Sequence, residues 1–306
     1  MMDDWVRLTA PALLAAELPE RAAILDPILA TKSIALLYGP RGLGKTFVAL
    51  GIARAAAAGE SFLGWTSPRP HRVLYLDGEM AAVDIRARLA AFGPPPPTLE
   101  FMLADLNRGP LLDLADPRSQ GRLMEAWGDP ELVVLDNLAS LAGLRTGDPD
   151  RWSELQRFLM ALRRVGLAVL MVHHANKKGL QRGSSRREDM LDLVMGMRRP
   201  PGWRPADGTR FQIHFEKARS LHGASIEPIE ARLHERDGLI RWQWATADDD
   251  PRLTRVVALL DRGLSVPRIG EELGVSRTVA YELRDRARRL GRLDPQPTPS
   301  HETRGD

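Results

Sequence analysis

Short apolar runs alternate with longer amphipathic stretches over the first two thirds of the chain. Residues 46–58 and 151–164 carry apolar side chains at helical spacing, and Gly51 is their one internal helix breaker. This alternation predicts an α/β fold with a mostly parallel central sheet and helices on both of its faces. The apolar runs that we interpret as strands cover residues 33–38, 73–76, 132–135, 167–172 and 211–215.

A predicted hairpin follows these runs. The apolar segments at 229–234 and 239–244 flank Arg236, Asp237 and Gly238, which form a typical turn sequence. They predict two antiparallel strands at the far edge of the sheet. Earlier in the chain, four consecutive prolines at 94–97 predict an extended surface loop, because proline has no backbone N–H to donate within a helix or a sheet.

The composition changes after the hairpin, and this change divides the chain. Ala, Thr and Asp make up residues 245–250, just before Pro251, which favours a linker at 246–252. We therefore expect a core at residues 1–245, with an N-terminal extension at 1–32, and a small helical domain at 253–293. Residues 294–306 are rich in Pro and Ser, and we expect them to be disordered.

The overall composition excludes several classes of protein. The 306 residues are 43% hydrophobic and 27% charged, so the chain can bury a core and is not wholly disordered. Cysteine is absent, which excludes disulfide frameworks, thiolate zinc sites and cysteine nucleophiles. The first residues are acidic, and no apolar run reaches the roughly 18 residues that a membrane span needs. We expect a cytoplasmic protein without membrane contact.

The excess of positive charge lies at the C-terminal end. Lys and Arg total 43 against 40 Asp and Glu, and residues 251–306 alone hold 11 Arg and 8 acidic residues, which accounts for the whole excess. A basic end favours nucleic acid as a partner, although arginine-rich helices are also common on solvated surfaces.

A phosphate-binding loop stands between the first predicted strand and the first predicted helix. Its sequence matches G-x-x-x-x-G-K-[ST], in which backbone N–H groups and a helix N-terminus face a polyphosphate. Lys45 supplies a charge between the β- and γ-phosphates, and Thr46 offers its hydroxyl to Mg²⁺. A glycine-rich turn with an accidental lysine is the alternative, which the flanking strand and helix disfavour. We expect ATP and Mg²⁺ to bind at Gly39, Pro40, Arg41, Gly42, Leu43, Gly44, Lys45 and Thr46.

Two acidic residues follow predicted strands in a way that suits phosphoryl transfer. Asp136 ends an apolar run typical of a central buried strand, so its carboxylate is placed to hold Mg²⁺ together with Thr46. Glu79 follows the run at 73–76 and is the candidate that polarises the attacking water, with Asp77 as its competitor. Taken alone, each acidic residue could equally well stabilise a turn after its strand and have no catalytic role. Their order relative to the phosphate loop favours the catalytic interpretation.

The order of the motifs resembles that of the RepA-type ATPases, which are hexameric replicative helicases of plasmids and phages in the RecA and DnaB superfamily. After the phosphate loop come Y-L-x-x-E, an apolar run ending in Asp, the segment His173-His174-Ala175-Asn176-Lys177 and the segment Arg182-Gly183-Ser184-Ser185. The resemblance covers about residues 20–244. It implies a RecA-like core, ATP hydrolysis, a homo-oligomeric ring of six subunits, and single-stranded DNA as the partner.

The resemblance also suggests how the γ-phosphate is sensed. His174 matches the sensor residue at the end of the fourth core strand, and His173 is the fallback if the register differs by one residue. Two ordinary strand-end histidines are the alternative.

A basic pair matches the K-x-R element by which DnaB-like subunits reach into a neighbour's nucleotide site. Lys217 and Arg219 stand two residues apart on one predicted strand, so their side chains point the same way. A solvated basic strand edge is the alternative. RepA-type helicases place their finger arginine soon after R-G-S-S, where this chain has Asp192, and Arg186 and Arg187 are therefore held in reserve.

The loop at 175–187 carries five basic side chains and no acidic one. In RecA-like folds this loop lines the channel of the ring and follows the backbone of single-stranded DNA, for which a basic and flexible segment is suited. Exposed loops are also often basic for solubility. The candidate DNA contacts here are Lys177, Lys178, Arg182, Arg186 and Arg187.

The C-terminal region has the pattern of a helix-turn-helix preceded by one further helix. Ser265 and Ser276 are candidate helix caps, Pro267 suits a first helical turn, and Gly274 ends the first of the two helices. A helical cap that docks on the ATPase core or on a partner subunit is the alternative. The outer face of the second helix, which we expect to contact duplex DNA, carries Arg277, Thr278, Tyr281 and Arg284.

Together these features predict a magnesium-dependent ATPase that works on DNA as an oligomeric motor, with a RepA-type replicative helicase as the first interpretation. A recombination ATPase without unwinding activity would use the same core. A regulator that is switched by ATP and acts through its helix-turn-helix is an alternative from another class. An adaptor with a relic nucleotide site is disfavoured, because every expected catalytic position is filled.

Overall fold

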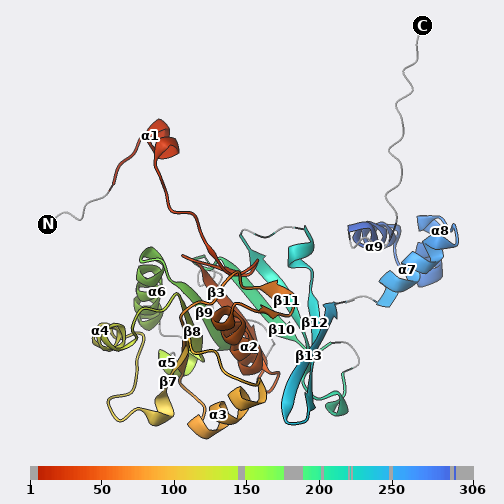
Figure 1. Cartoon of the computed structure of the whole chain (residues 1–306). Coiled ribbons are helices and arrows are strands. Elements are labelled where there is room, and N and C mark those ends of the chain that lie inside the picture. The colour runs from red at the N-terminus through yellow and green to blue at the C-terminus, as the bar shows by residue number, and fades with distance from the viewer. Residues whose placement is uncertain are drawn as a thin grey trace.

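In the computed structural model, nine strands of the described residues form one central sheet, in the order β13-β12-β11-β10-β3-β9-β8-β6-β7 (Figure 1). The structure describes residues 6–143, 149–175, 189–200, 203–219, 221, 223–247, 251–289 and 293. The strands are β3 (Ile34–Gly39), β6 (Val73–Asp77), β7 (Leu99–Leu103), β8 (Leu132–Asp136), β9 (Ala168–His174), β10 (Leu193–Arg198), β11 (Arg210–Ala218), β12 (Ile229–Arg236) and β13 (Leu239–Thr246).

Six neighbouring strands, from β10 through β3, β9, β8 and β6 to β7, run parallel. The carboxyl ends of β3, β6, β8 and β9 therefore meet at one edge of the sheet, where ligands bind in open α/β folds. The other three strands are antiparallel. We predicted β11 within the parallel alternation, and that was wrong. The connection from residue 198 to residue 210 is too short for a helical crossover.

Helices cover both faces of the sheet, as predicted (Figure 1). Ala35 and Leu37 of β3 pack in one core together with α2, and Leu36 packs in a second core together with α6. This division follows from the strand period of two, which points successive side chains to opposite faces. Helices α2 (Lys45–Ala58) and α3 (Ala82–Ala91) belong to the first face, and α4 (Pro117–Ala126), α5 (Leu138–Leu141) and α6 (Pro149–Arg164) belong to the second.

The N-terminal segment divides into an exposed part and a buried part. Helix α1 (Ala10–Ala15) has no buried residue and stands away from the sheet in Figure 1. Strands β1 (Ala23–Leu25) and β2 (Leu29–Ala30) form a small hairpin whose Ile24 and Leu29 belong to the first core. Part of the expected extension at 1–32 therefore packs into the core. A further hairpin consists of β4 (Ser61–Phe62) and β5 (Trp65–Thr66).

The predicted hairpin at the sheet edge is confirmed. Strands β12 and β13 pair antiparallel, with β13 outermost. Asp237 and Gly238 both have positive φ, 55° and 73°, as the tight turn of a two-residue hairpin requires. Residues 94–97 form no helix or strand, as their prolines predict.

Three helices follow the sheet: α7 (Pro251–Asp261), α8 (Val266–Leu273) and α9 (Arg277–Arg289). They have a core of their own, which includes Leu253, Ile269 and Leu283. Gly274 ends α8 in a left-handed conformation, and the Ser276 hydroxyl accepts a bond of 3.3 Å from the N–H of Val279, so both predicted boundaries are confirmed. Among the described residues, no helix combines the length and the apolar character that a bilayer crossing needs.

Candidate active site

The phosphate loop connects β3 to α2 at the carboxyl edge of the sheet. Gly42 and Gly44 have φ values of 72° and 96°, a left-handed conformation that side chains disfavour. A Cβ at Gly44 would also lie 2.8 Å from Cγ2 of Thr209. Conformation therefore favours glycine at both positions, and space also requires it at 44; the two glycines let the backbone turn into the N-terminus of α2.

Lys45 is buried at the first residue of α2. Its Nζ donates to the carbonyl oxygens of Gly39 and Pro40, at 2.9 and 2.8 Å. Burial lowers the pKa of Lys45 to about 8, and the neighbouring Asp136 and Glu79 oppose that shift. The ammonium group thus lies inside the loop, where phosphate oxygens can replace the two carbonyls as acceptors.

Asp136 ends β8 with its carboxylate buried. Tyr75 donates its hydroxyl to Oδ2 of Asp136 at 2.7 Å, and the Thr46 side chain also bonds to this carboxylate. Burial raises the pKa of Asp136 to about 6, so the carboxylate is poorly compensated by its neighbours. A cation beside Thr46 and Asp136 would supply the missing compensation.

This donor set fits Mg²⁺. One hydroxyl and one carboxylate leave most of an octahedral shell to water and phosphate, which is how Mg²⁺ usually binds beside a nucleotide. Within the described part of the chain, no three His, Asp or Glu side chains form a metal cluster. Thr46 and Asp136 are therefore suited to a metal that arrives with its nucleotide.

Asp77 and Glu79, which compete in the sequence, differ in the structure. Oδ1 of Asp77 accepts from the backbone N–H groups of Glu79 and Met80, at 2.9 and 2.6 Å. Burial raises the pKa of Asp77. The Glu79 side chain is about half exposed, and its Oε2 lies 3.2 Å from Nε2 of His174. Asp77 thus shapes the turn, and Glu79 has the carboxylate that water can reach.

Asn137 is a site residue that the sequence did not lead us to predict. Its Nδ2 donates to Glu79 Oε2 and lies 3.1 Å from His174 Nε2. Its Oδ1 accepts from the N–H of Ser140 at 3.1 Å and so caps α5. The only sequence signal was its place directly after Asp136, at the carboxyl end of a buried strand.

His174 ends β9, and burial together with the nearby Lys45 lowers its pKa. His174 lines the same cavity as Lys45, Glu79 and Asp136, whereas the buried His173 is not part of that lining. The geometry therefore favours the first of our two sensor candidates.

A cavity of about 500 Å³ joins these groups. Six described residues that the sequence did not indicate also line it: Phe47, Met80, Ala81, Asp84, Arg88 and Thr209. Thr209 faces Gly44, and the guanidinium of Arg88 lies 4.9 Å from the ring centre of Phe47. The predicted residues that share the lining are Gly42, Gly44, Lys45, Thr46, Asp77, Glu79, Asp136 and His174.

Lys217 and Arg219 lie at the opposite end of the sheet from this cavity. Ala218 pairs with Leu193, which in turn pairs with Ala35 near the start of β3, whereas the phosphate loop follows the end of β3. The Arg219 guanidinium donates to the carbonyl of Asp189. The two basic residues do not reach the cavity of their own subunit.

The predicted DNA contacts fall in two places. Lys177, Lys178, Arg182, Arg186 and Arg187 lie outside the described residues. On α9, Arg277, Thr278 and Tyr281 are exposed, and Arg284 lies 4.7 Å from the ring centre of Tyr281 and pairs with Asp285.

A comparison with curated proteins found a relative of part of this chain. The DNA repair protein RadA of Brucella abortus (strain 2308) is 27% identical over 168 residues, which are 53% of this chain and 32% of RadA, so the chain spans about a third of that relative. The solved structures that are similar include two with a TM-score of 0.48 each. They are the flagellar accessory protein FlaH of Methanocaldococcus jannaschii (10% identity, 70% of this chain, 90% of FlaH) and a KaiC-like protein of Pyrococcus horikoshii OT3 (15% identity, 72% and 93%).

A family model described as an AAA domain, AAA_25, matches residues 4–179, more than half of the chain. The match contains the phosphate loop, Glu79, Asp136 and His174, and it ends before β10. The chain therefore belongs to this AAA-domain family, and its phosphate loop makes it a P-loop NTPase.

Proposed function

We propose that this chain hydrolyses ATP as one subunit of an oligomeric, DNA-dependent motor. The observation that carries the proposal is the convergence of Lys45, Thr46, Asp136, Glu79 and His174 on one cavity of about 500 Å³. Phosphoryl transfer to water needs these kinds of group: a cation for the phosphates, oxygen ligands for a metal, and an acceptor that orients the water.

Each residue has a separate part in the proposed reaction. Lys45 exchanges its carbonyl acceptors for phosphate oxygens, and Thr46 and Asp136 hold Mg²⁺, which when bound offsets charge on the phosphoryl group. Glu79 accepts a hydrogen bond, and then a proton, from the attacking water. His174 lies beside Glu79 and lines the same cavity as the phosphate loop. There its ring contacts the γ-phosphate and so couples the presence of that phosphate to the position of β9.

Lys217 and Arg219 act on a neighbouring subunit in this proposal. They lie far from their own phosphate loop, at the amino end of β3, which suits residues that complete the cavity of another copy. A guanidinium and an ammonium there would neutralise charge on the transferred phosphoryl group. The proposal therefore includes a closed homo-oligomeric ring, with six subunits by analogy with the RepA-type helicases.

DNA is the partner that we propose for the motor. The support is the basic segment at 175–187, the exposed Arg277, Thr278 and Tyr281 on α9, and the similarity to a protein named for DNA repair. A RepA-type replicative helicase is the finer form of this proposal, and recombination without unwinding is its nearest variant.

A second function, an ATP-switched DNA-binding regulator, is favoured by α7–α9. These helices have their own core, and they follow the ATPase core in the manner of a separate module. The two functions differ in what hydrolysis does. With Glu79→Gln, a motor loses its action on DNA, whereas a switch stays in its ATP-bound state and remains active.

The proposed function is tested by the rate of ATP hydrolysis, measured over a range of protein concentrations with and without single-stranded DNA, while the size of the particle is followed by light scattering. We expect the rate per subunit to rise with concentration and with DNA, and Arg219→Ala to abolish that rise. Arg241→Ala, an exposed arginine on β13, is the matched control. A rate that ignores concentration and Arg219 would refute the shared site.

A further inference from the structure

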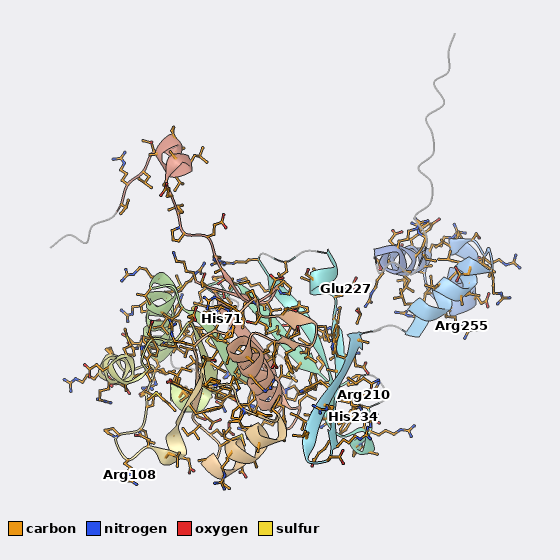
Figure 2. All side chains as sticks on the ribbon, viewed as in Figure 1. His71, Arg108, Arg210, Glu227, His234 and Arg255 are labelled. Carbon is orange, nitrogen blue, oxygen red and sulfur yellow. The ribbon has the colours of Figure 1, made fainter. Side chains whose placement is uncertain are left out.

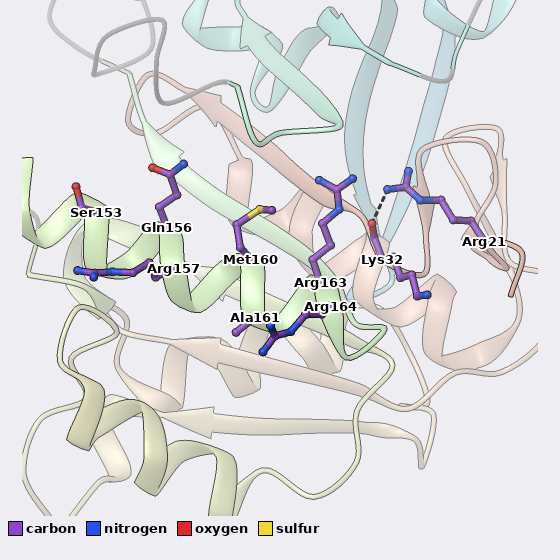
Figure 3. A pocket seen from close by; sticks show the side chains of 9 residues that line it. All are labelled: Arg21, Lys32, Ser153, Gln156, Arg157, Met160, Ala161, Arg163 and Arg164. Carbon is purple, nitrogen blue, oxygen red and sulfur yellow. Dashed lines mark hydrogen bonds between the residues drawn. The ribbon is translucent and has the colours of Figure 1, made fainter. Parts of the chain in front are cut away.

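A second large cavity lies away from the nucleotide site. It is a cleft of about 1010 Å³ between α6 and the segment that leads into β3, and it shares no lining residue with the cavity that contains Lys45. In Figure 3 the side chains of α6 stand in a row along the cleft, with Arg21 and Lys32 at one end. The side chains that line it are Arg21, Lys32, Ser153, Gln156, Arg157, Met160, Ala161, Arg163 and Arg164.

The cleft is strongly positive. Of the nine lining residues that the structure describes, five are Lys or Arg and none is acidic. Two carboxylates pair with these cations from outside the lining: Asp192, 3.2 Å from Arg21 and 3.5 Å from Arg163, and Glu154, which pairs with Arg157. Five cations against two carboxylates leave a charge of +3.

Two of the cations form no ion pair within the part of the chain that the structure describes. Among the residues that the structure describes, no Asp or Glu forms an ion pair with Lys32 or with Arg164. The backbone at Lys32 is held by Arg21, whose guanidinium donates to the Lys32 carbonyl at 2.7 Å. Asp192 accepts a second hydrogen bond from the Arg21 guanidinium. The Arg21 guanidinium is thus fixed beside the Lys32 backbone, while Lys32 and Arg164 supply cations that form no ion pair among the described residues.

The spacing of the cations favours a polymer over a small anion. Arg157 and Arg164 lie on one face of α6, and at 1.5 Å per residue their seven-residue separation spans roughly 10 Å. Charges spread over that length do not converge on one phosphate group. They match a chain of phosphates, since each strand of duplex DNA carries one charge per about 3.4 Å.

We propose that this cleft binds the sugar–phosphate backbone of DNA, as a site separate from the loop at 175–187 and from α9. The choice of DNA among polyanions rests on the proposed function, whereas the cleft itself rests on its charge and shape. Arg157, Arg164 and Lys32 contact phosphates, and the short polar side chains of Ser153 and Gln156 add hydrogen bonds without reading the sequence.

The test is the salt dependence of binding to a fluorescein-labelled oligothymidine, measured by anisotropy with the full chain and without nucleotide. The double variant Arg157→Gln/Arg164→Gln removes two cations from the cleft. The matched control is Arg118→Gln/Arg122→Gln, which removes two exposed arginines of α4. We expect the cleft variant to bind severalfold more weakly. The slope of the logarithm of the binding constant against the logarithm of the salt concentration should become shallower by about 1.4. Two phosphate contacts are lost, and each contributes about 0.7 to the slope on single-stranded DNA. The control keeps the wild-type slope.

Three results would overturn the inference. The first is that the cleft variant keeps the wild-type affinity and salt slope, which would place the DNA site elsewhere on the chain. The second is that the wild type binds no oligonucleotide, which would also remove DNA from the proposed function. The third is that polyglutamate binds as tightly as the oligonucleotide and loses as much affinity in the cleft variant, which would make the cleft a site for acidic proteins. ATP hydrolysis without DNA, measured in parallel, separates these results from a failure of the proposed ATPase, because neither arginine lines the nucleotide cavity.

Discussion

Nδ2 of Asn137 lies 3.1 Å from Nε2 of His174, which connects the end of β8 to the end of β9 at the carboxyl edge of the sheet. The same nitrogen donates to the Glu79 carboxylate, and the amide oxygen is occupied by the N–H of Ser140. Because Ser140 needs an acceptor, the amide can present only its N–H₂ group to Glu79 and His174. Asn137 therefore positions the residue that we propose to orient water.

We expect Asn137→Ala to lower kcat for ATP hydrolysis by on the order of tenfold to 100-fold, because a small misplacement of a reacting group costs about that much. The KM for ATP should change less, since Asn137 does not line the cavity. Asn137→Asp keeps the oxygen that caps α5 and removes the N–H₂ donor, so it should lower kcat in the same way. A variant with normal kcat in either form would contradict a positioning role.

Replacing Glu79 tests the acceptor for the attacking water. Glu79→Gln keeps the shape of the side chain and removes its basicity, so kcat should fall by about 10²–10⁴ while ATP still binds. Glu100→Gln, at an exposed position on the edge strand β7, is the control and should leave kcat unchanged. Steady-state phosphate release and equilibrium binding of a labelled ATP give the two readouts. Loss of binding together with turnover would instead give Glu79 a structural role.

The buried carboxylate of Asp136 makes stability depend on pH. Its pKa of about 6 exceeds the ordinary 3.8, so folding favours the protonated form. The stability that this group contributes is present below pH 4 and is lost as pH rises through about 6, and the shift corresponds to about 3 kcal/mol. Without nucleotide and Mg²⁺, Asp136→Asn should therefore become more stable than wild type as pH rises from 4 to 7, while its ATPase activity is lost. Urea unfolding at several pH values measures this difference, with exposed Asp129→Asn as the control. Equal pH profiles would contradict the raised pKa.

The core of α7–α9 can be disrupted without touching the sheet. Ile269 is fully buried in that core, and Ile269→Ala should cost about 2–5 kcal/mol and raise hydrogen exchange in residues 251–289. ATP hydrolysis measured without DNA should stay at the wild-type rate. Thr278→Ala, at an exposed position of α9, should change neither readout. If the basal rate fell with the helices, they would act as a cap on the ATPase core, which is the alternative interpretation of the C-terminal pattern.

Local patterns in the sequence predicted most of the phosphate loop and its surroundings. Strand β3, Lys45 and helix α2 follow one another, so a glycine-rich motif between an apolar run and a helical run defines them together. Asp136 was predictable for a similar reason, because the apolar run before it marks a buried parallel strand.

Contacts between distant segments were not predictable in this way. Asn137 meets Glu79 across 58 residues and His174 across 37, and only the strand order β9-β8-β6 brings the three together. Strands β7 and β10 were also not predicted from the sequence. Glu100 interrupts the first run, and Gly196 interrupts the second, where a Cβ would lie 2.6 Å from the Glu216 carboxylate. Strand pairing, rather than local propensity, decides the conformation of such short segments.

Phosphate release from ATP by wild type and by Lys45→Ala, with and without Mg²⁺, tests the central claim most directly. Wild type should hydrolyse ATP only with Mg²⁺, and Lys45→Ala should stay at the background rate because the loop loses its buried cation. Arg118→Ala, an exposed residue of α4, should match wild type. Hydrolysis that is equal in wild type and Lys45→Ala, or absent from wild type, would contradict the claim.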